Sequence, residues 1–246
     1  MPGAPSFSAQ HGFSSRFEWG EPGMRALAPH VATIIIVDVL SFSTSVEIAT
    51  SRGACVLPVP WKDERAGALA KQHQAVLAGS GDAPWSLRPS SLVAIPAGTR
   101  LVLPSPNGAM LTSIASKTGA TVIVGSLRNA GAIGARCRMS ASDVAVIAAG
   151  ERWNITEGPL RPSVEDQIGA GAILSAIGGN PSPEAIGAIG AFEAARHNLL
   201  DMLWETASGR ELVERGYPGD VALAAELDAA ASIPVVQKDG FIADGR

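Results

Sequence analysis

The sequence of 246 residues has little of what marks several common classes of protein. It contains two cysteines, Cys55 and Cys137, which form no CxxC pair, and its four histidines lack the spacing of metal ligands. A disulfide framework and a zinc site are therefore not expected. Both cysteines are predicted to be small core residues.

Basic residues are few and scattered. The chain has 19 Lys and Arg residues against 23 Asp and Glu residues, which gives a formal net charge of −4. Because no segment gathers the basic residues, nucleic acid is not an expected partner. No apolar run reaches the roughly eighteen residues of a membrane span, and the N-terminus lacks an apolar core flanked by basic residues. The sequence therefore favours a soluble, cytoplasmic protein without a membrane partner.

The motifs of the common phosphate-cleaving and ester-cleaving enzymes are also absent. Asp38 is not followed two positions later by a second aspartate, as the haloacid dehalogenase type of phosphatase would need. No GxxxxGK[ST] loop and no GxSxG turn occurs. The segment GAGAIL at 169–174 lies inside a helical pattern, so it does not indicate a dinucleotide site.

What the sequence does contain is typical of a compact globular protein. It is 46% hydrophobic and 17% charged, with 27 glycines and 17 prolines that suit many tight turns. The length fits one large α/β domain. We expect a flexible N-terminal segment at 1–16 and a single α/β domain at 17–246.

Short β-branched runs alternate with stretches of helical period, which indicates parallel strands joined by crossover helices. Several of the apolar runs do not alternate with polar residues, so helices should cover both faces of the sheet. The sequence thus predicts a three-layer α/β/α sandwich around a largely parallel or mixed sheet, with a helix-rich C-terminal third. The expected strands lie at 31–40, 54–59, 100–106, 120–126, 143–150 and 232–236.

Polar residues follow four of these strands, where each turn opens a helix. In a parallel α/β sheet such turns meet at one edge, and helix N-termini attract anions there. The alternative is that each polar residue only caps its own helix. The residues of the predicted anion cradle are Ser41, Ser43, Thr44, Asn107, Gly108, Ser126, Arg128, Asn129, Glu151 and Arg152.

Three acids complete the predicted site. Asp38 ends a strand, and Glu165 and Asp166 fall in the first turn of a helix. Carboxylate oxygens, together with water and a phosphate, are the usual ligands of Mg²⁺. Favourable interaction with the helix dipole is the alternative explanation for Glu165 and Asp166.

A series of segments resembles the magnesium-dependent 2-phosphosulfolactate phosphatases and their bacterial relatives. The resemblance covers about residues 31–236 and implies an α/β fold and metal-assisted hydrolysis of a small anionic phosphorylated metabolite. It rests on DVLSFSTSV at 38–46, LVLPSPNGAML at 101–111, GSLRNA at 125–130, SVEDQIGAGAI at 163–173, SGRELVERG at 208–216 and DVALAAELD at 220–228.

With this resemblance, Asp38 and Asp166 are the predicted Mg²⁺ ligands. Asp166 and Glu165 are both candidates for the second ligand or for the base that orients water, and the sequence does not separate those roles. The cradle residues would bind the substrate, with Arg128 or Arg152 on a carboxylate or sulfonate. A homodimer is a further open expectation.

The chain departs from the family pattern at three places. Ser41 stands where the family often has Arg, GSGD at 79–82 stands for a Gly-Glu-Arg-Gly turn, and Arg152 follows Gly150 and Glu151 where the family tends to read Gly-Thr-Glu. A binding protein for a small anionic metabolite, without catalysis, is therefore the rival hypothesis.

Overall fold

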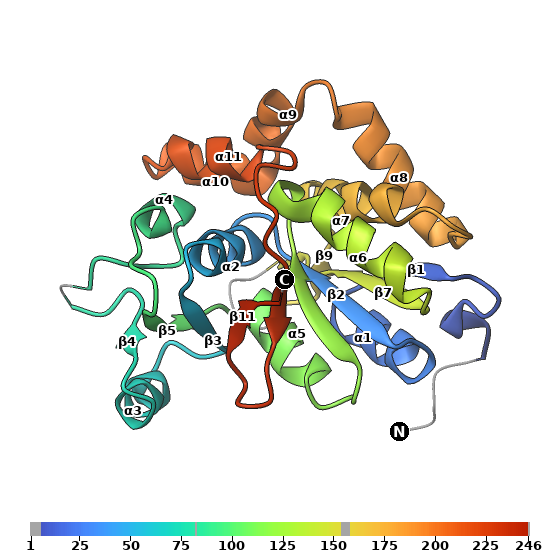
Figure 1. Ribbon diagram of the computed structural model, residues 1–246. Helices are drawn as coiled ribbons and strands as arrows, with labels where there is room; N and C mark the ends of the chain where they lie inside the picture. Colours follow the sequence, from blue (N-terminus) through green and yellow to red (C-terminus); the bar gives the residue numbers. More distant parts are fainter. Residues whose placement is uncertain (1–5, 82, 154–157, 246) are drawn as a thin grey trace.

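The computed structural model describes residues 6–81, 83–153 and 158–245. Nine strands form one sheet in the order β1-β7-β2-β6-β10-β11-β3-β5-β4, and β8 and β9 form a separate two-stranded ribbon (Figure 1). The strands are β1 (Ser15–Trp19), β2 (Thr33–Val37), β3 (Cys55–Val59), β4 (Val76–Leu77), β5 (Arg100–Pro104), β6 (Thr121–Gly125), β7 (Val144–Ala148), β8 (Glu151–Arg152), β9 (Leu160–Arg161), β10 (Pro234–Val236) and β11 (Ile242–Asp244).

Helices cover both faces of this sheet. The helices α6, α7 and α8 pack on one face of the β1-β7-β2-β6 half, and α1 and α5 pack on the opposite face (Figure 1). The α-helices are α1 (Gly20–Leu27), α2 (Phe42–Ser51), α3 (Glu64–Gln72), α4 (Pro89–Leu92), α5 (Gly108–Ala115), α6 (Ala130–Ser140), α7 (Val164–Ile177), α8 (Pro183–Ala195), α9 (Leu199–Glu205), α10 (Ala207–Glu214) and α11 (Pro218–Ala224). Three 3₁₀ turns are η1 (Ser6–Ala9), η2 (Ala28–His30) and η3 (Leu127–Asn129).

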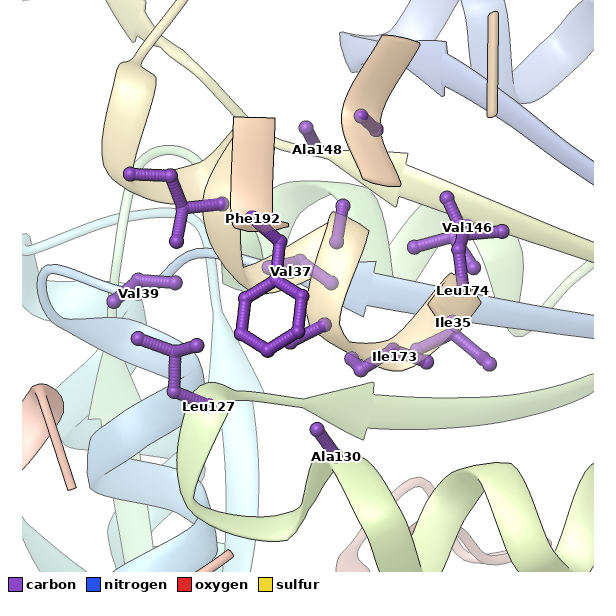
Figure 2. Close-up of a cluster of buried hydrophobic side chains, with 14 of the residues drawn as sticks. Ile35, Val37, Val39, Leu127, Ala130, Val146, Ala148, Ile173, Leu174 and Phe192 are labelled. Carbon is purple, nitrogen blue, oxygen red and sulfur yellow. The ribbon is translucent and has the colours of Figure 1, made fainter. Parts of the chain in front are cut away.

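The core between the sheet and α7 explains why the central strands are apolar on both sides. All five residues of β2 and all five of β7 are buried. In Figure 2, Ile35, Val37 and Val146 of the sheet face Ile173 and Leu174 of α7. Burying such a side chain stabilises the fold by about 1.5–3 kcal/mol. These strands therefore need helices on both faces, as the non-alternating sequence predicts.

The pairing of the strands determines where their loops meet. The strands β1, β7, β2 and β6 are parallel to one another, and so are β3, β5 and β4. The β10–β11 hairpin joins the two groups through three successive antiparallel pairings, so the groups run in opposite directions along the sheet. Adjacent strands rotate by roughly 20–25° on average, so the five steps from β2 to β5 turn the sheet by roughly 100–125°. This twist brings the turn after β5 close to the turn after β2.

The α/β class, the mixed and mostly parallel sheet and the helix-rich C-terminal third are confirmed. Two features go beyond the sequence prediction. The edge strand β1 begins at Ser15, inside the segment 1–16 that we expected to be flexible, and pairs in register with β7. The short strand β11 completes the hairpin through which the two halves of the sheet join.

The two cysteines lie at the positions that the fold gives to small apolar residues. Cys137 lies on the buried face of α6, and Cys55 is half-buried at the start of β3. Burial raises the pKa of the Cys137 thiol to about 11, so it carries little nucleophilic thiolate at neutral pH. In the described part of the chain, no helix is both long and apolar enough to cross a membrane.

Candidate active site

Asp38 lies where β2 ends and is held by the first N–H groups of two helices. Its Oδ1 accepts a hydrogen bond from the Phe42 N–H of α2 at 3.2 Å. Its Oδ2 accepts one from the Gly108 N–H of α5 at 2.8 Å. The free N–H groups and positive dipole of a helix N-terminus stabilise a carboxylate. Asp38 is thus a buried acid that ties the turn after β2 to the turn after β5.

Asp166 ties the turn after β2 to the turn after β7. From the first turn of α7, its Oδ1 accepts a hydrogen bond from the Val39 N–H at 2.7 Å, and its Oδ2 accepts one from the Gly150 N–H at 2.9 Å. Gly150 has φ +65°, and a Cβ there would come within 2.8 Å of Leu160. The turn after β7 therefore depends on glycine, and Asp166 fixes its position relative to β2.

Glu165, the neighbour of Asp166, is buried without a complete set of hydrogen bonds. Its side-chain atom Oε2 is inaccessible and has no hydrogen-bond partner among the described residues. The hydroxyl of Ser163, the N-cap residue of α7, is also buried and unpartnered. A buried carboxylate oxygen without a partner is costly, because it has lost its water and gained nothing in exchange. The N-terminus of α7 therefore offers an oxygen that a ligand could use.

Glu151 supplies the fourth acid from β8. Its Oε2 accepts a hydrogen bond from Asn107 Nδ2 at 2.9 Å, so the turn after β5 also orients this side chain. Glu151 and Asn107 both line a cavity of about 440 Å³, together with Arg152 and Leu160. Glu151 is half-buried, whereas the other three acids are buried.

The four acids act on one another electrostatically. The pKa of Asp38 is raised to about 6, mainly by burial and also by the Glu165 charge, although two backbone hydrogen bonds oppose this rise. Burial and then the Asp38 charge raise the pKa of Glu151 to about 7. Burial, Asp38 and Glu165 together raise the pKa of Asp166 well above its ordinary value. Without a cation, the cluster therefore retains protons that isolated carboxyls would release near pH 4.

The donor set suits a hard divalent cation. It consists of carboxylate oxygens, which Mg²⁺ prefers, and it includes the unpartnered Oε2 of Glu165. A cation would also neutralise the repulsion that raises these pKa values. Within the described ranges, no three acidic, histidine or cysteine side chains are arranged closely enough to hold a metal ion. The acids thus offer oxygen donors of the kind that Mg²⁺ prefers.

The hydroxyl groups after β2 mostly hold the turn itself. Ser43 Oγ donates to the Asp38 carbonyl at 2.7 Å and accepts from the Asp38 N–H at 2.9 Å. Thr44 Oγ1 donates to the Val39 carbonyl at 2.8 Å. Both residues are buried, so their hydroxyls are used by the backbone. Ser41 differs, because it is half-buried and lines a second cavity of about 420 Å³.

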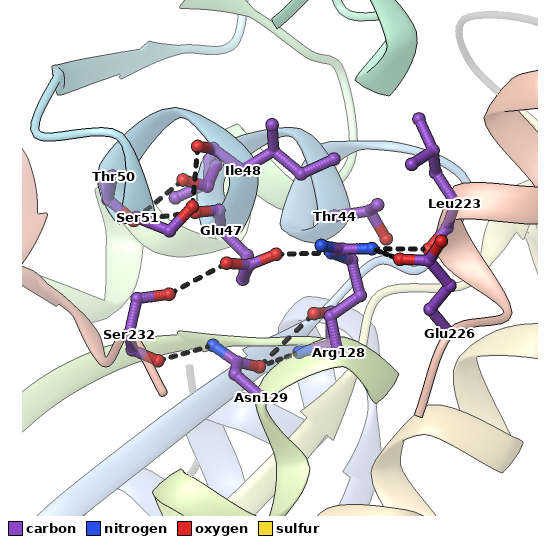
Figure 3. A network of polar contacts seen from close by, with 12 residues as sticks. Thr44, Glu47, Ile48, Thr50, Ser51, Arg128, Asn129, Leu223, Glu226 and Ser232 are labelled. Carbon is purple, nitrogen blue, oxygen red and sulfur yellow. Dashed lines mark hydrogen bonds and ion pairs between the residues drawn. The ribbon is translucent and has the colours of Figure 1, made fainter. Parts of the chain in front are cut away.

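Three cradle residues of the turn after β6 belong to a separate polar network (Figure 3). Arg128 donates to Glu47 Oε2 at 2.6 Å and also forms an ion pair with Glu226. Ser126 and Asn129 cap η3 through their side chains, and Asn129 Nδ2 donates to the Ser232 carbonyl at 3.1 Å. These contacts connect α2, η3 and the C-terminal segment. The caps that Ser126 and Asn129 make match the alternative explanation of this turn, and substrate binding by the three residues stays a prediction.

The remaining predicted residues divide between the two cavities. Arg152 lines the cavity of Glu151, where its guanidinium donates to the Gly158 carbonyl at 3.0 Å. Gly79 and Ser80 of the GSGD turn line the cavity of Ser41, and Asp82 lies outside the described residues. The structure thus brings together Asp38, Asn107, Gly108, Glu151, Glu165 and Asp166.

Sequence reasoning missed how the acids are positioned. It placed Glu151 among the substrate-binding residues and did not predict its interaction with Asp38. It also missed the N–H groups of Val39 and Gly150, which hold Asp166. The available signal was the glycine before Glu151, because a glycine between a strand and an acid often marks a turn with positive φ.

The fold and the site define an α/β protein with a cluster of four interacting carboxyls where the turns after β2, β5 and β7 meet the start of α7. The chain belongs to the 2-phosphosulpholactate phosphatase family, whose model matches residues 24–239. Two similar proteins are both named "Probable 2-phosphosulfolactate phosphatase". The Gloeobacter violaceus protein is 25% identical over 226 residues, covering 86% of this chain and 91% of its own length. The Thermus thermophilus protein is 28% identical over 232 residues, covering 88% and 92%.

Proposed function

We propose that this protein hydrolyses a small anionic phosphomonoester with Mg²⁺ held at the four-carboxyl cluster. The observation that carries the proposal is the buried, unpartnered Oε2 of Glu165 beside acids whose pKa values are raised. A folded protein keeps such an arrangement where a ligand compensates for it. Family membership supports a phosphorylated metabolite as the substrate.

The contacts give the acids different roles. Glu165 and Asp38 would hold the ion, since Glu165 has an unpartnered oxygen and Asp38 interacts with it. Both oxygens of Asp166 accept backbone N–H groups, as both oxygens of Asp38 do, so these contacts do not separate the two acids, and Asp166 stays a candidate second ligand. When bound, Mg²⁺ supplies positive charge that stabilises the transferring phosphoryl group.

Glu151 is the proposed general base. With a pKa of about 7, Glu151 is partly ionised near neutral pH and still accepts a proton readily. Asn107 orients its carboxylate at the wall of an open cavity, from which water can enter. In this role, Glu151 would take a proton from the water whose oxygen bonds to phosphorus, while the bond from phosphorus to the ester oxygen breaks and the leaving alkoxide takes a proton from solvent. The helix N-termini of α2 and α5 stabilise negative charge.

A phosphatase assay with and without Mg²⁺ tests the proposal and separates it from the rival binding protein. The panel contains phosphoglycolate, phospholactate and 2-phosphosulfolactate. We expect phosphate release that requires Mg²⁺ and that falls at least about a hundredfold in Glu151→Gln, as for loss of a general base. Binding of these compounds without phosphate release would instead identify a non-catalytic binding protein.

A further inference from the structure

A second cavity, of about 420 Å³, opens beside the carboxyl cluster. It lies over the ends of β3 and β5, and α10 and the segment before α11 close one side of it. Ser41, Lys62, Leu77, Arg88, Pro104 and Arg215 are among the residues that line it. Its volume falls within the roughly 300–1,000 Å³ of cavities that bind small organic molecules.

The turns after β2 and β5 lie between this cavity and the acids. Each turn contributes a residue to the cavity lining and an N–H group that holds Asp38. Ser41 lines the cavity, and the next residue, Phe42, donates its N–H to Asp38. Pro104 also lines the cavity, and the turn that follows it leads to Gly108, whose N–H holds the other oxygen of Asp38. A molecule in the cavity therefore lies against the backbone that positions Asp38.

Three basic side chains line the cavity. Its described lining contains Lys62, Arg88 and Arg215 and no acidic residue. Lys62 has no ion-pair partner among the described residues, and Arg215 pairs with Glu211 on an exposed surface. Arg88 stacks over the Tyr217 ring at 3.8 Å and pairs with the buried Asp220. Lys62 and Arg215 are thus the cations most readily available to an anionic ligand.

Between these cations the wall is of mixed character. Ser41, Ser80 and Ser86 contribute hydroxyl groups, and an apolar part is formed by Ala66, Ala78, Leu87, Leu212 and Tyr217. The small apolar residues and the one aromatic ring of that part suit a flat or branched hydrocarbon group.

We propose that this cavity binds the organic part of the substrate, and that the substrate is a phosphomonoester with an apolar body and a second anionic group at its far end. The phosphate faces the carboxyl cluster, the apolar body lies along the cavity wall, and Lys62 and Arg215 bind the distal anion. This inference rests on the proposed phosphatase function. It assigns specificity to residues outside the predicted cradle.

Two matched substrates test it: phenyl phosphate and 4-carboxyphenyl phosphate, which adds only the distal carboxylate. We expect the wild-type protein to favour the carboxylated compound by about tenfold or more in kcat/KM, as for a charge-assisted hydrogen bond. The double variant Lys62→Ala/Arg215→Ala should lose this preference, so that its kcat/KM values for the two compounds become nearly equal. The control Arg65→Ala removes the same kind of charge from an exposed arginine that does not line the cavity, and it should keep the preference.

Binding of non-hydrolysable phosphonates keeps the test decisive if the protein proves inactive. Isothermal titration calorimetry would compare benzylphosphonate with 4-carboxybenzylphosphonate in the same three proteins. Turnover of both phosphates without a preference overturns the cavity assignment and leaves the phosphatase function intact. Absence of turnover, with tighter binding of the carboxylated phosphonate that Lys62 and Arg215 control, overturns the phosphatase function and supports the cavity assignment. Equal binding of the two phosphonates by an inactive protein overturns both.

Discussion

Glu165 is an acid of the site whose burial is not fully compensated by hydrogen bonds. Its neighbour Asp166 has each carboxylate oxygen paired with a backbone N–H, whereas Glu165 Oε2 is buried without a partner. Adjacent positions in one helical turn thus have opposite environments. The difference fits one acid that supports the turns and another that receives a ligand.

The raised pKa of Glu151 predicts how stability changes with pH in metal-free protein. The pKa is raised from 4.5 to about 7 in the folded state, so the protonated form is favoured by folding. The contribution of this carboxyl to the free energy of unfolding is fully present below its unfolded-state pKa, and it is lost as pH rises through about 7. Glu151→Gln keeps an oxygen for Asn107 and cannot ionise. We expect its Tm to exceed that of the wild type by roughly 3–6 °C at pH 8.

Thermal unfolding at pH 5 and pH 8, with chelator present, measures this effect. At pH 5 Glu151 is largely protonated, so the two proteins should unfold at nearly the same temperature. Glu184→Gln, which changes an exposed glutamate of α8, is the matched control and should show no such pH dependence. A variant Tm that equals the wild-type Tm at both pH values would contradict the predicted pKa shift.

Among the elements, the start of α5 is the most tightly restricted. A Cβ on Gly108 would meet the buried Phe42 ring and come within 2.7 Å of Asp38 Oδ2. Gly108→Ala must therefore push α5 away from α2 or move Asp38. We expect a loss of about 1–3 kcal/mol in the free energy of unfolding, measured by urea denaturation, and weaker Mg²⁺ binding.

Gly187→Ala provides the control within α8. A Cβ at Gly187 meets nothing within 4 Å, so the change should be neutral or stabilise by up to about 1 kcal/mol. Equal stability of the two alanine variants would show that the close contact at α5 does not exist.

The network around Arg128 predicts a structural role for this residue. Glu47 is buried and pairs with Arg128, which also donates to the Leu223 carbonyl at 3.1 Å. Arg128→Ala leaves the Glu47 charge unpaired in the interior. We expect a loss of about 3–5 kcal/mol of stability, with an unchanged KM in the fraction that remains folded. The double variant Arg128→Met/Glu47→Gln should recover most of that stability, whereas a large rise in KM for Arg128→Ala would return Arg128 to the substrate site.

Most elements could be predicted from the sequence because their signals are local. The strands β2, β6 and β7 are continuous β-branched runs, and each is followed by residues that cap a helix. The strand β1 could not be predicted, because SRFEW lacks an apolar run and forms a strand only by pairing with β7. Edge strands of this kind depend on tertiary contacts rather than on propensity.

The site could be predicted only in part, for a similar reason. Asp38, Glu165 and Asp166 stand at helix starts, which the sequence indicates. Whether a polar residue at such a start faces a ligand or its own backbone depends on side-chain direction. Ser43 and Thr44 face the backbone, and Ser126 and Asn129 cap η3, and no local pattern distinguishes them from Ser41.

At the scale of the whole molecule, the twist of a mixed sheet joins two halves into one site. The β3-β5-β4 half runs opposite to the β2 half, yet its turn at Asn107 and Gly108 reaches Asp38 and Glu151. The cavity lined by Lys62, Arg88 and Arg215 lies on the β3-β5-β4 side. The cavity of Glu151 borders α1 and β8. The acids thus lie between two cavities of different character.

This arrangement predicts the choice of substrate among small phosphomonoesters. Ser41 lines the cavity where the family often has an arginine, so a fixed guanidinium for a nearby second anion is missing. We expect a lower kcat/KM for 2-phosphosulfolactate than for phospholactate, by about tenfold or more. Ser41→Arg should reverse the order. A strong wild-type preference for 2-phosphosulfolactate would show that other residues bind its sulfonate.

Titration of Mg²⁺ into the wild type and Glu165→Gln by calorimetry, with phosphate release measured on the same samples, tests the central claim most directly. The account predicts that Glu165→Gln stays folded, binds Mg²⁺ at least about tenfold more weakly and loses activity in parallel, because a neutral amide cannot replace the carboxylate oxygen. The control Glu184→Gln should behave as the wild type. Unchanged Mg²⁺ affinity and activity in folded Glu165→Gln would contradict the account and place the metal, or the chemistry, elsewhere.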